Sequence, residues 1–361
     1  MRCALMVLAA TGLLLVGCKS DSDDGFSPGS SSGGGARATA VAPQAATGAE
    51  CAGVHGDPPR PAGPSLVGTL ANLYPVELLC PLRGGELLTW TDPLGTPREA
   101  CLHTPANASA QTPLPLLTFL GGSLFPGDPQ TIINGMEFLI GTADLSGDPA
   151  RPGFSFLVIE GRDKQHFYPF PDDHAWGFDN WYRNFDRKDP ALNVDVATID
   201  HFIHEVQARG VVDAQRLYLS GHSNGAAMAI IYGLNTPGIA AMSVYSSPDP
   251  FRDIGDPCPQ APFGNNLRPV MTIHNDCDIG GICQTGSENF SATMAQSMPQ
   301  VEYERVLIDL QQGEATQCDA SCSYDGDPTQ LLTLGSLRHL LWPTQWTGRM
   351  LEFMRDRPLP N

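Results

Sequence analysis

Residues 216–229 read RLYLSGHSNGAAMA, an apolar run followed by a Gly-x-Ser-x-Gly turn and a series of small residues. The apolar run predicts a β-strand, and the residues after the turn predict a helix. So sharp a turn leaves no room for side chains beside it, which explains Gly221 and Gly225. We interpret the motif as a nucleophile elbow, in which backbone strain lifts the hydroxyl of Ser223 out for attack. The alternative is a plain surface turn, which would require neither the strand before the motif nor the helix after it.

The length and charge of the chain limit what it can be. It has 361 residues and a net charge of −18 at pH 7. Although this length could hold two average domains, sheets flanked by helices often fold around one core of about 250 to 300 residues, so one large domain is expected. The basic residues are scattered along an acidic chain, which repels phosphate backbones. We therefore expect no nucleic-acid partner.

The first 17 residues resemble the signal peptide of a bacterial lipoprotein. Arg2 precedes an apolar run at residues 4–16, and small residues come before Cys18. The run is shorter than the roughly 20 residues of a transmembrane helix, which disfavours that alternative. Cys18 would become the lipidated N-terminus, so we expect export and a lipid anchor in the cell envelope. Lys19 favours the outer membrane, with release from the cell as the alternative.

The next two segments differ from the rest of the chain in composition. Residues 18–50 are almost entirely Ser, Gly, Asp, Ala, Thr and Pro, which predicts a flexible tether. Residues 51–85 are rich in Pro and Gly without a clear period, and we expect an irregular lead-in tied down by disulfides. Residues 86–361 would then form the folded domain.

Cysteine usage agrees with export. Of ten cysteines, Cys3 would leave with the signal peptide and Cys18 would carry lipid, which leaves an even number for disulfides. The candidates are Cys51, Cys80, Cys101, Cys258, Cys277, Cys283, Cys318 and Cys322. Their connectivity is open, with the close pairs Cys277–Cys283 and Cys318–Cys322 as local guesses. Zinc is the alternative for such pairs, but no Cys-x-x-Cys or His-x-x-x-His accompanies them, so no metal site is expected.

Strand and helix signals alternate along the folded domain. Strands are expected at residues 86–91, 99–104, 114–120, 154–160, 240–245, 269–274 and 301–307, besides the one before the elbow. Helices are expected at residues 194–208, 287–296 and 345–355, besides the one after the elbow. This alternation predicts a mostly parallel central sheet with helices on both faces.

An aromatic-rich stretch lies between the strand at 154–160 and the helix at 194–208. Two interpretations stay open: its rings pack a loop onto the sheet, or some of them form the wall of an acyl or aryl pocket beside Ser223. The candidate pocket residues are Trp176, Trp181 and Tyr182.

A serine hydroxyl needs a base to accept its proton and a carboxylate to orient that base. In α/β-hydrolases these groups follow in the order Ser, Asp or Glu, His. The strand at 269–274 is followed by Asn-Asp-Cys-Asp, a strand-end loop where a carboxylate can face the elbow. Asp278 is the first candidate and Asp276 the alternative. Both could instead only cap a loop or the next helix.

Residues 269–278, PVMTIHNDCD, resemble the Pro-Val-x-x-x-His-Gly-x-x-Asp run of secreted polyhydroxybutyrate depolymerases and feruloyl esterase-like hydrolases of the carbohydrate esterase family 1 type. The resemblance covers roughly residues 86–357. It implies an α/β-hydrolase fold with Asp278 as the acid, although Asn275 stands where the family usually has Gly. The family's base lies in a His-x-Trp-Pro segment near the C-terminus. Here RHLLWP at residues 338–343 nominates His339, with one extra residue between His and Trp.

The remaining part of the site is the oxyanion hole. Residues 120–123, LGGS, stand where relatives carry Leu-His-Gly-x, with Gly121 in place of His. Acyl transfer needs fixed donors for the developing oxyanion. We nominate the backbone N–H groups of Asn224 and Ser123, with Gly122 as the substitute.

These features favour an exported serine esterase that needs no cofactor and acts on hydroxyalkanoate oligomers or hydroxycinnamoyl-sugar esters. No further binding module is expected after the closing helix, which favours soluble fragments over solid polymer. A serine peptidase on the same scaffold and a non-catalytic surface-binding homologue are the alternatives.

Overall fold

A computed structural model describes residues 2–8, 13–19, 60–61, 75–93, 95, 97–122, 127–161, 166–167, 181, 194–251, 264, 266–278, 284–308 and 338–360. The chain divides into two compact units, residues 1–43 and 44–361. In the first, strands β1 (Arg2–Leu8) and β2 (Leu13–Lys19) pair antiparallel, with Cys3 opposite Cys18. The expected tether lies outside the described residues from residue 20 on.

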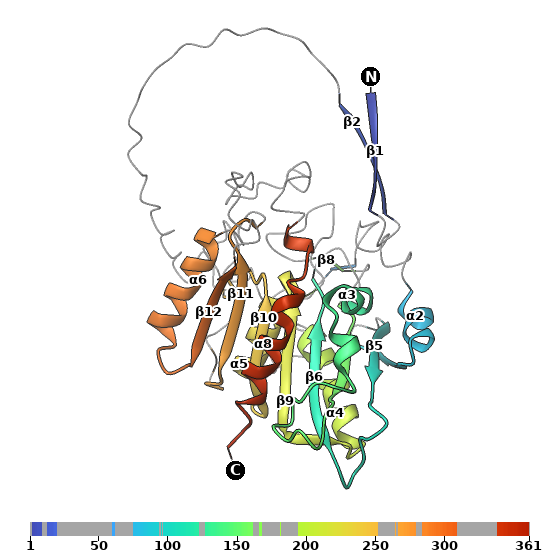
Figure 1. Ribbon diagram of the computed structural model, residues 1–361, viewed down its shortest axis with the longest axis vertical. Helices are drawn as coiled ribbons and strands as arrows, with labels where there is room; N and C mark the ends of the chain where they lie inside the picture. The colour runs from blue at the N-terminus through green and yellow to red at the C-terminus, as the bar shows by residue number, and fades with distance from the viewer. Residues whose placement is uncertain are drawn as a thin grey trace. The chain divides into compact units, whose positions relative to one another are not determined.

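The second unit is built on an eight-stranded sheet with the strand order β12-β11-β10-β9-β6-β7-β5-β4 (Figure 1). The strands are β4 (Glu86–Thr91), β5 (Pro97–His103), β6 (Leu114–Leu120), β7 (Ser155–Ile159), β9 (Val212–His222), β10 (Ile239–Tyr245), β11 (Val270–Asn275) and β12 (Tyr303–Ile308). From β7 to β12 all neighbours are parallel, whereas β5 runs antiparallel to both β7 and β4. A separate short antiparallel pair joins β3 (Arg60–Pro61) and β8 (His166–Phe167). The predicted mostly parallel sheet is confirmed.

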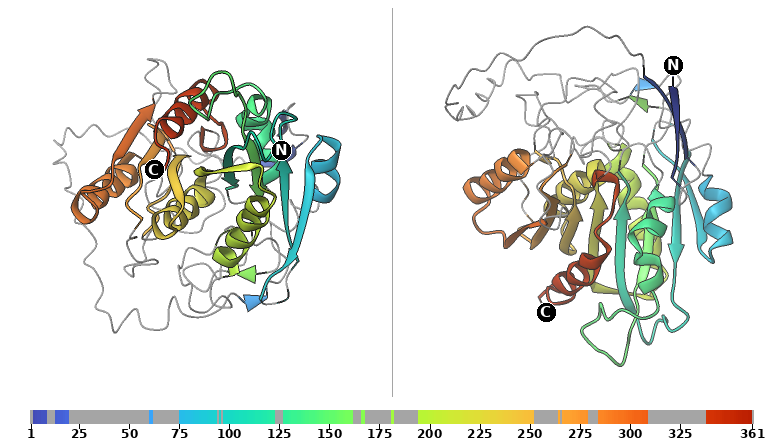
Figure 2. Two further views of the ribbon diagram at one scale, coloured as in Figure 1. Left: turned by 90° about the horizontal axis from the view of Figure 1, so that it is seen from below. Right: turned by 45° about the horizontal axis from the view of Figure 1, so that its top comes forward.

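Helices cover both faces of this sheet, as the alternating pattern predicts (Figure 2). The helices are α2 (Val76–Leu82), α3 (Gly127–Asn134), η1 (Met136–Leu139), α4 (Val194–Ala208), α5 (Ser223–Asn235), α6 (Gln284–Ser297) and α8 (Thr344–Arg355). One core cluster joins the sheet to α4, α5 and α6, and the other joins it to α2, η1 and α8. The sheet therefore lies between two apolar layers, which is why its central strands are buried on both sides.

Side-chain alternation along the central strands connects the two layers. In β6, Leu116 and Leu120 belong to the cluster with α4 and α5, whereas Leu117 and Phe119 belong to the cluster with α8. All seven residues of β6 are buried. A continuous apolar run is what such a strand requires, and it is the signal that predicts this strand.

The lead-in at residues 51–85 is not irregular throughout, which corrects the expectation from its Pro and Gly content. Residues 76–82 form α2, whose Val76 and Cys80 are buried one helical turn apart. Pro75 stands just before the helix, where a missing N–H and a fixed φ are tolerated, and Pro81 lies in the last turn. The disulfide part of the expectation is confirmed, since Cys80 is bonded to Cys101 of β5 (S–S 2.07 Å).

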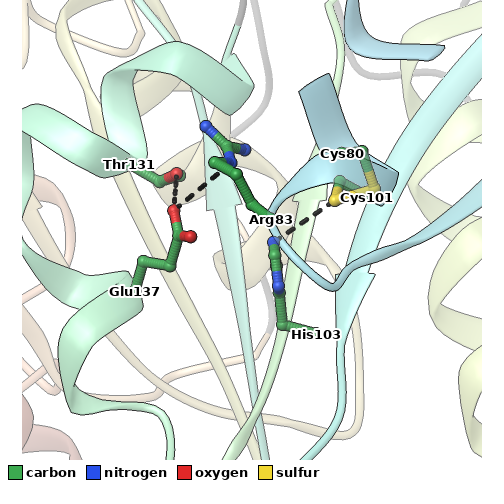
Figure 3. The surroundings of a disulfide bond; sticks show 6 residues. All are labelled: Cys80, Arg83, Cys101, His103, Thr131 and Glu137. Carbon is green, nitrogen blue, oxygen red and sulfur yellow. Dashed lines mark hydrogen bonds and ion pairs between the residues drawn. A yellow bond between two sulfur atoms is a disulfide. The ribbon is translucent and has the colours of Figure 1, made fainter. Parts of the chain in front are cut away.

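Polar contacts extend this attachment toward α3 and η1 (Figure 3). Arg83 Nε, just after α2, lies 3.6 Å from Glu137 Oε2, and Thr131 Oγ1 donates to the same oxygen at 3.3 Å. His103 Nε2 lies 3.3 Å from the Cys101 sulfur, and burial lowers the pKa of His103. The disulfide therefore joins α2 to β5, and the Arg83 contact joins the end of α2 to η1, which follows β6 in the chain.

Cys277 is also disulfide-bonded. Of the other nominated cysteines, Cys51, Cys258, Cys283, Cys318 and Cys322 lie outside the described residues. The two local pairs, Cys277–Cys283 and Cys318–Cys322, therefore stay predictions.

Candidate active site

The elbow lies where β9 passes directly into α5. Ser223 has φ 54°, a left-handed conformation that is rare for a residue with a side chain and that stores strain. A Cβ on Gly221 would lie 2.7 Å from the Gly225 carbonyl oxygen, and one on Gly225 would overlap the Gly121 carbonyl oxygen. The steric reason predicted for both glycines is confirmed. The second contact also shows that the end of β6 packs directly against the elbow.

Three predicted side chains, far apart in sequence, meet at this turn. His339 Nε2 lies 2.8 Å from Ser223 Oγ, and His339 Nδ1 lies 2.6 Å from Asp278 Oδ1. Asp278 is fully buried, and Ser223 and His339 are each 6% exposed. Because a carboxylate can only accept, Nδ1–H donates to Asp278 and leaves Nε2 to accept from the serine hydroxyl. This is the arrangement that general-base activation of a serine requires.

The alternative acid, Asp276, lies elsewhere. Its Oδ1 is 3.4 Å from Arg338 Nη1, and its side chain is 26% exposed. Asp276 therefore forms a partly solvated ion pair beside the histidine segment, and Asp278 is the carboxylate that contacts the imidazole.

The second oxygen of Asp278 is held by two residues that sequence reasoning missed. The Ser246 hydroxyl, at the end of β10, donates to Asp278 Oδ2, and Asn275 Nδ2 donates to the same atom at 2.9 Å. Ser246 has φ 53°, so its backbone is strained like that of Ser223. Asn275 is the position where the resembling family has Gly, and here its amide orients the carboxylate.

A second buried layer supports the segment that carries His339. His222 Nε2–H donates to the His339 carbonyl oxygen at 2.8 Å, and Tyr245 OH donates to the Arg338 carbonyl oxygen at 3.1 Å. The His222 and Tyr245 rings are stacked, with centroids 5.5 Å apart. Burial, with His339 adding to it, lowers the pKa of His222 to about 3, and burial raises the pKa of Tyr245. Both side chains are therefore neutral near pH 7 and act as fixed hydrogen-bond donors.

His274, in β11, has a different setting. It is fully buried, and among the described residues neither of its ring nitrogens has a hydrogen-bond partner. Burial lowers its pKa to about 4, which keeps the ring neutral. These surroundings favour structural roles for His222 and His274.

The nominated oxyanion donors have three different outcomes. Asn224 is the second residue of α5, so its N–H precedes the first intrahelical hydrogen bond and lies at the positive end of the helix dipole. Ser123 lies outside the described residues. The substitute, Gly122, is wrong as a donor because its N–H already donates to Gln130 Oε1 at 3.0 Å. A Cβ on Gly122 would lie 3.0 Å from Ser223 Cβ, so this residue lies against the nucleophile without offering a donor.

The nominated pocket residues are also corrected in part. Trp181 is fully buried within the core cluster of α4 and α5 and does not present a surface to a substrate. Its ring packs into the core because the indole N–H has a backbone acceptor there, Gly121 O at 2.8 Å. Trp176 and Tyr182 lie outside the described residues.

Within the described part of the chain, no three His, Cys, Asp or Glu side chains come together in a way that could hold a metal ion. None of the described helices has the length and apolar character needed to cross a bilayer.

The fold and the site together define a class. Eight strands in this order, an elbow between a strand and a helix, and Ser223, Asp278 and His339 in contact in this chain order are the features of an α/β-hydrolase with a serine-hydrolase triad geometry.

Comparison with known proteins gives similarity at the level of structure alone. No protein-family model and no curated protein matches the chain. Among solved structures it is similar to a thermostable esterase (14% identity, TM-score 0.44, 76% of this chain and 63% of that one). An S-formylglutathione hydrolase from Agrobacterium tumefaciens is similar at 10% identity and TM-score 0.48, over 76% of this chain and 96% of that one.

A puromycin-hydrolyzing peptidase from Mycobacterium tuberculosis is similar at 13% identity and TM-score 0.41 over 62% of this chain. The chain spans 63% of the thermostable esterase's own length and 35% of the peptidase's. The similar structures include both esterases and peptidases.

Proposed function

We propose that this protein is an exported serine esterase that cleaves carboxylic esters through an acyl-enzyme on Ser223. The observation that carries the proposal is the position of His339, with one ring nitrogen at the Ser223 hydroxyl and the other at a buried carboxylate. A structural histidine would need only one of these contacts.

The reaction would begin with proton transfer from Ser223 to His339 Nε2 as Oγ forms a bond to the ester carbonyl carbon. The carbonyl π electrons move to the oxygen, and the Asn224 N–H and a second backbone donor stabilise that oxyanion. Removing one such donor costs about 3 kcal/mol of transition-state stabilisation in another serine hydrolase. Asp278 stabilises the imidazolium that forms in this step.

Collapse of the tetrahedral intermediate breaks the bond to the leaving oxygen, which takes the proton from His339 and departs as an alcohol. A water molecule then gives its proton to His339 and adds to the acyl carbon. The second collapse releases the carboxylic acid and returns the proton to Ser223. The two residues that hold Asp278 Oδ2 keep the carboxylate directed at the imidazole through both steps.

The substrate class is proposed from the resemblance at residues 269–278 and 338–343 to polyhydroxybutyrate depolymerases and feruloyl esterase-like hydrolases. It favours hydroxyalkanoate oligomers or hydroxycinnamoyl-sugar esters. Export and lipid attachment at Cys18, probed by radiolabelled fatty acid incorporation in the wild type and in Cys18→Ser, belong to the same proposal.

The test compares turnover of p-nitrophenyl esters, feruloyl esters and hydroxybutyrate oligomers with turnover of matched p-nitroanilides, using the mature protein. We expect ester hydrolysis that Ser223→Ala abolishes. Anilide hydrolysis at a comparable kcat/KM would replace the esterase with a peptidase. Wild-type protein inactive on every substrate would replace it with a non-catalytic homologue.

A further inference from the structure

Trp181 makes two hydrogen bonds, one to the end of β6 and one to the elbow. Its indole Nε1–H donates to the Gly121 carbonyl oxygen at 2.8 Å, at the end of β6. Its backbone N–H donates to Asn224 Oδ1 at 2.8 Å, on the elbow. One fully buried residue therefore joins the turn after β6 to the residue that follows the nucleophile.

The peptide unit between Gly121 and Gly122 is held at both of its polar atoms. Trp181 binds its carbonyl oxygen, and Gln130 of α3 accepts from its N–H at 3.0 Å. Both glycines are buried, and a Cβ on Gly122 would lie 3.0 Å from Ser223 Cβ. Two side chains thus fix the orientation of a backbone plane that lies directly beside the nucleophile.

The side chain of Asn224 depends on Trp181 in the same way. Because Trp181 N–H is a donor, the Asn224 atom facing it must be the amide oxygen. The other end of this amide, Nδ2, is buried and has no hydrogen-bond partner among the described residues. The bond to Trp181 is therefore the contact that sets the Asn224 side chain in this part of the structure.

We propose that Trp181 is a positioning residue for the oxyanion hole: it holds the Gly121–Gly122 peptide unit and Asn224 in register with each other, so that the Asn224 N–H is aligned beside the nucleophile before substrate binds. The inference rests on the proposed function. Preorganised donors need no rearrangement during the reaction, and misplacement by about 1 Å can cost about 100-fold in rate. Loss of the Trp181 indole bond should therefore slow the chemical step without weakening substrate binding.

The test is Trp181→Phe, which keeps an aromatic ring and removes the indole N–H. We expect kcat for a p-nitrophenyl ester to fall between about 10-fold and 100-fold, with KM within about twofold of the wild type. Active-site titration with a fluorophosphonate corrects kcat for any inactive fraction. The pKa in the kcat/KM profile should not move, because His339 and Asp278 are unchanged.

A trifluoromethyl ketone gives a second readout. Ser223 Oγ adds to its carbonyl carbon, the proton goes to His339, and the oxygen becomes an oxyanion that needs the same donors. We expect its Ki to rise in Trp181→Phe by the same factor by which kcat/KM falls. A merely structural role would lower the melting temperature without this proportionality.

Tyr232→Phe is the matched control. Tyr232 belongs to the same core cluster and also loses one donor, since its OH donates to Asp200 Oδ1 at 2.6 Å. It should lose stability with kcat and Ki unchanged. If Trp181→Phe is too unstable to purify, Gln130→Met is the substitute, because it removes the acceptor of the Gly122 N–H on the same peptide unit. We expect the same fall in kcat with KM unchanged.

The outcomes separate this inference from the proposed function. If Ser223→Ala abolishes turnover but Trp181→Phe or Gln130→Met leaves kcat/KM and Ki within twofold of the wild type, the positioning role is overturned and the esterase stands. If Ser223→Ala retains turnover, the proposed function fails first.

Discussion

Two networks of buried charged side chains in this molecule differ in the groups that they connect. One joins only charged side chains, and the other ends on a serine hydroxyl. In the first, Arg98 on β5 binds Asp92 at the end of β4 (3.3 Å) and Asp195 in the first turn of α4 (2.7 Å). In the second, Asp278 binds His339, which binds Ser223. The charged groups of both are almost fully withdrawn from water, so burial does not distinguish them.

The difference lies in the proton. A guanidinium stays protonated at all ordinary pH values, so the Arg98 network can only hold elements together. An imidazole can accept and return a proton near pH 7, and its network ends on a hydroxyl at the first residue of α5. A buried network becomes a reaction site when it contains a transferable proton and ends on a nucleophile.

Removing the nucleophile should produce the largest effect. In Ser223→Ala we expect kcat for the best ester to fall by about 10⁶-fold, as in serine hydrolases whose nucleophile is removed. The melting temperature should stay within a few degrees of the wild type, because alanine leaves the turn intact. Steady-state kinetics checks the fall in kcat, and differential scanning fluorimetry on the same preparation checks the melting temperature.

Neutralising the buried carboxylate should have the next largest effect. In Asp278→Asn the amide cannot hold Nδ1–H as an ionised acceptor does, and we expect kcat to fall by about 10⁴-fold. Asp276→Asn, in the partly solvated pair with Arg338, is the matched control and should change kcat less than about threefold. Equal losses in the two variants would contradict the assignment of the acid.

Mutation of Arg98 should lower the free energy of unfolding and leave kcat unchanged. Arg98→Met leaves two buried carboxylates without their cation, and we expect the free energy of unfolding to drop by about 3 to 5 kcal/mol. The kcat per titrated active site should be unchanged. As a control, Arg349→Met breaks an ion pair with Glu304 whose side chains are 40% and 32% exposed, and should cost less than about 1 kcal/mol.

The last comparison concerns pH and the buried histidines, and its test is a change in one slope. The folded pKa values of His222 and His274 are lowered to about 3 and about 4, whereas the unfolded chain binds protons near pH 6.5. Between pH 6.5 and about 4 the unfolded state therefore binds more protons, and stability falls as pH falls, by up to about 1.4 kcal/mol per pH unit for each histidine.

His274→Leu removes one of these two contributions. Its free energy of unfolding, measured by urea titration at several pH values, should fall less steeply below pH 6.5 than that of the wild type. His204→Gln, on the exposed side of α4, should keep the wild-type slope. A wild-type slope in His274→Leu would show that the ring is not held neutral in the folded state.

Local signals account for the parts of the structure that the sequence predicts well. Strand β6 and helix α4 have the predicted bounds because a continuous apolar run and an amphipathic stripe are visible within a short window. Ser223, Asp278 and His339 could also be predicted from the sequence, because chain order and position at a strand end restrict the candidates. Helices α2 and α3 were missed because both are short and contain Pro, and neither has a long apolar period.

The supporting contacts of the site had no such signal. Ser246 reaches Asp278 only because the ends of β10 and β11 lie side by side, whereas Asn275 ends β11 and reaches Asp278 three residues further along the same loop. The sequence predicts Trp181 in a substrate pocket, because an aromatic residue in a loop near the nucleophile fits that role. Its burial and its bond to Gly121 depend on how distant segments pack, which a periodic pattern does not encode.

The most direct measurement of the central claim, that Ser223 is an activated nucleophile, is mass spectrometry of the folded protein after reaction with a fluorophosphonate. We predict one label per chain, located by peptide mapping on Ser223, and no label in Ser223→Ala or in protein unfolded before treatment. A label on another residue, or equal labelling of Ser223→Ala, would contradict the account.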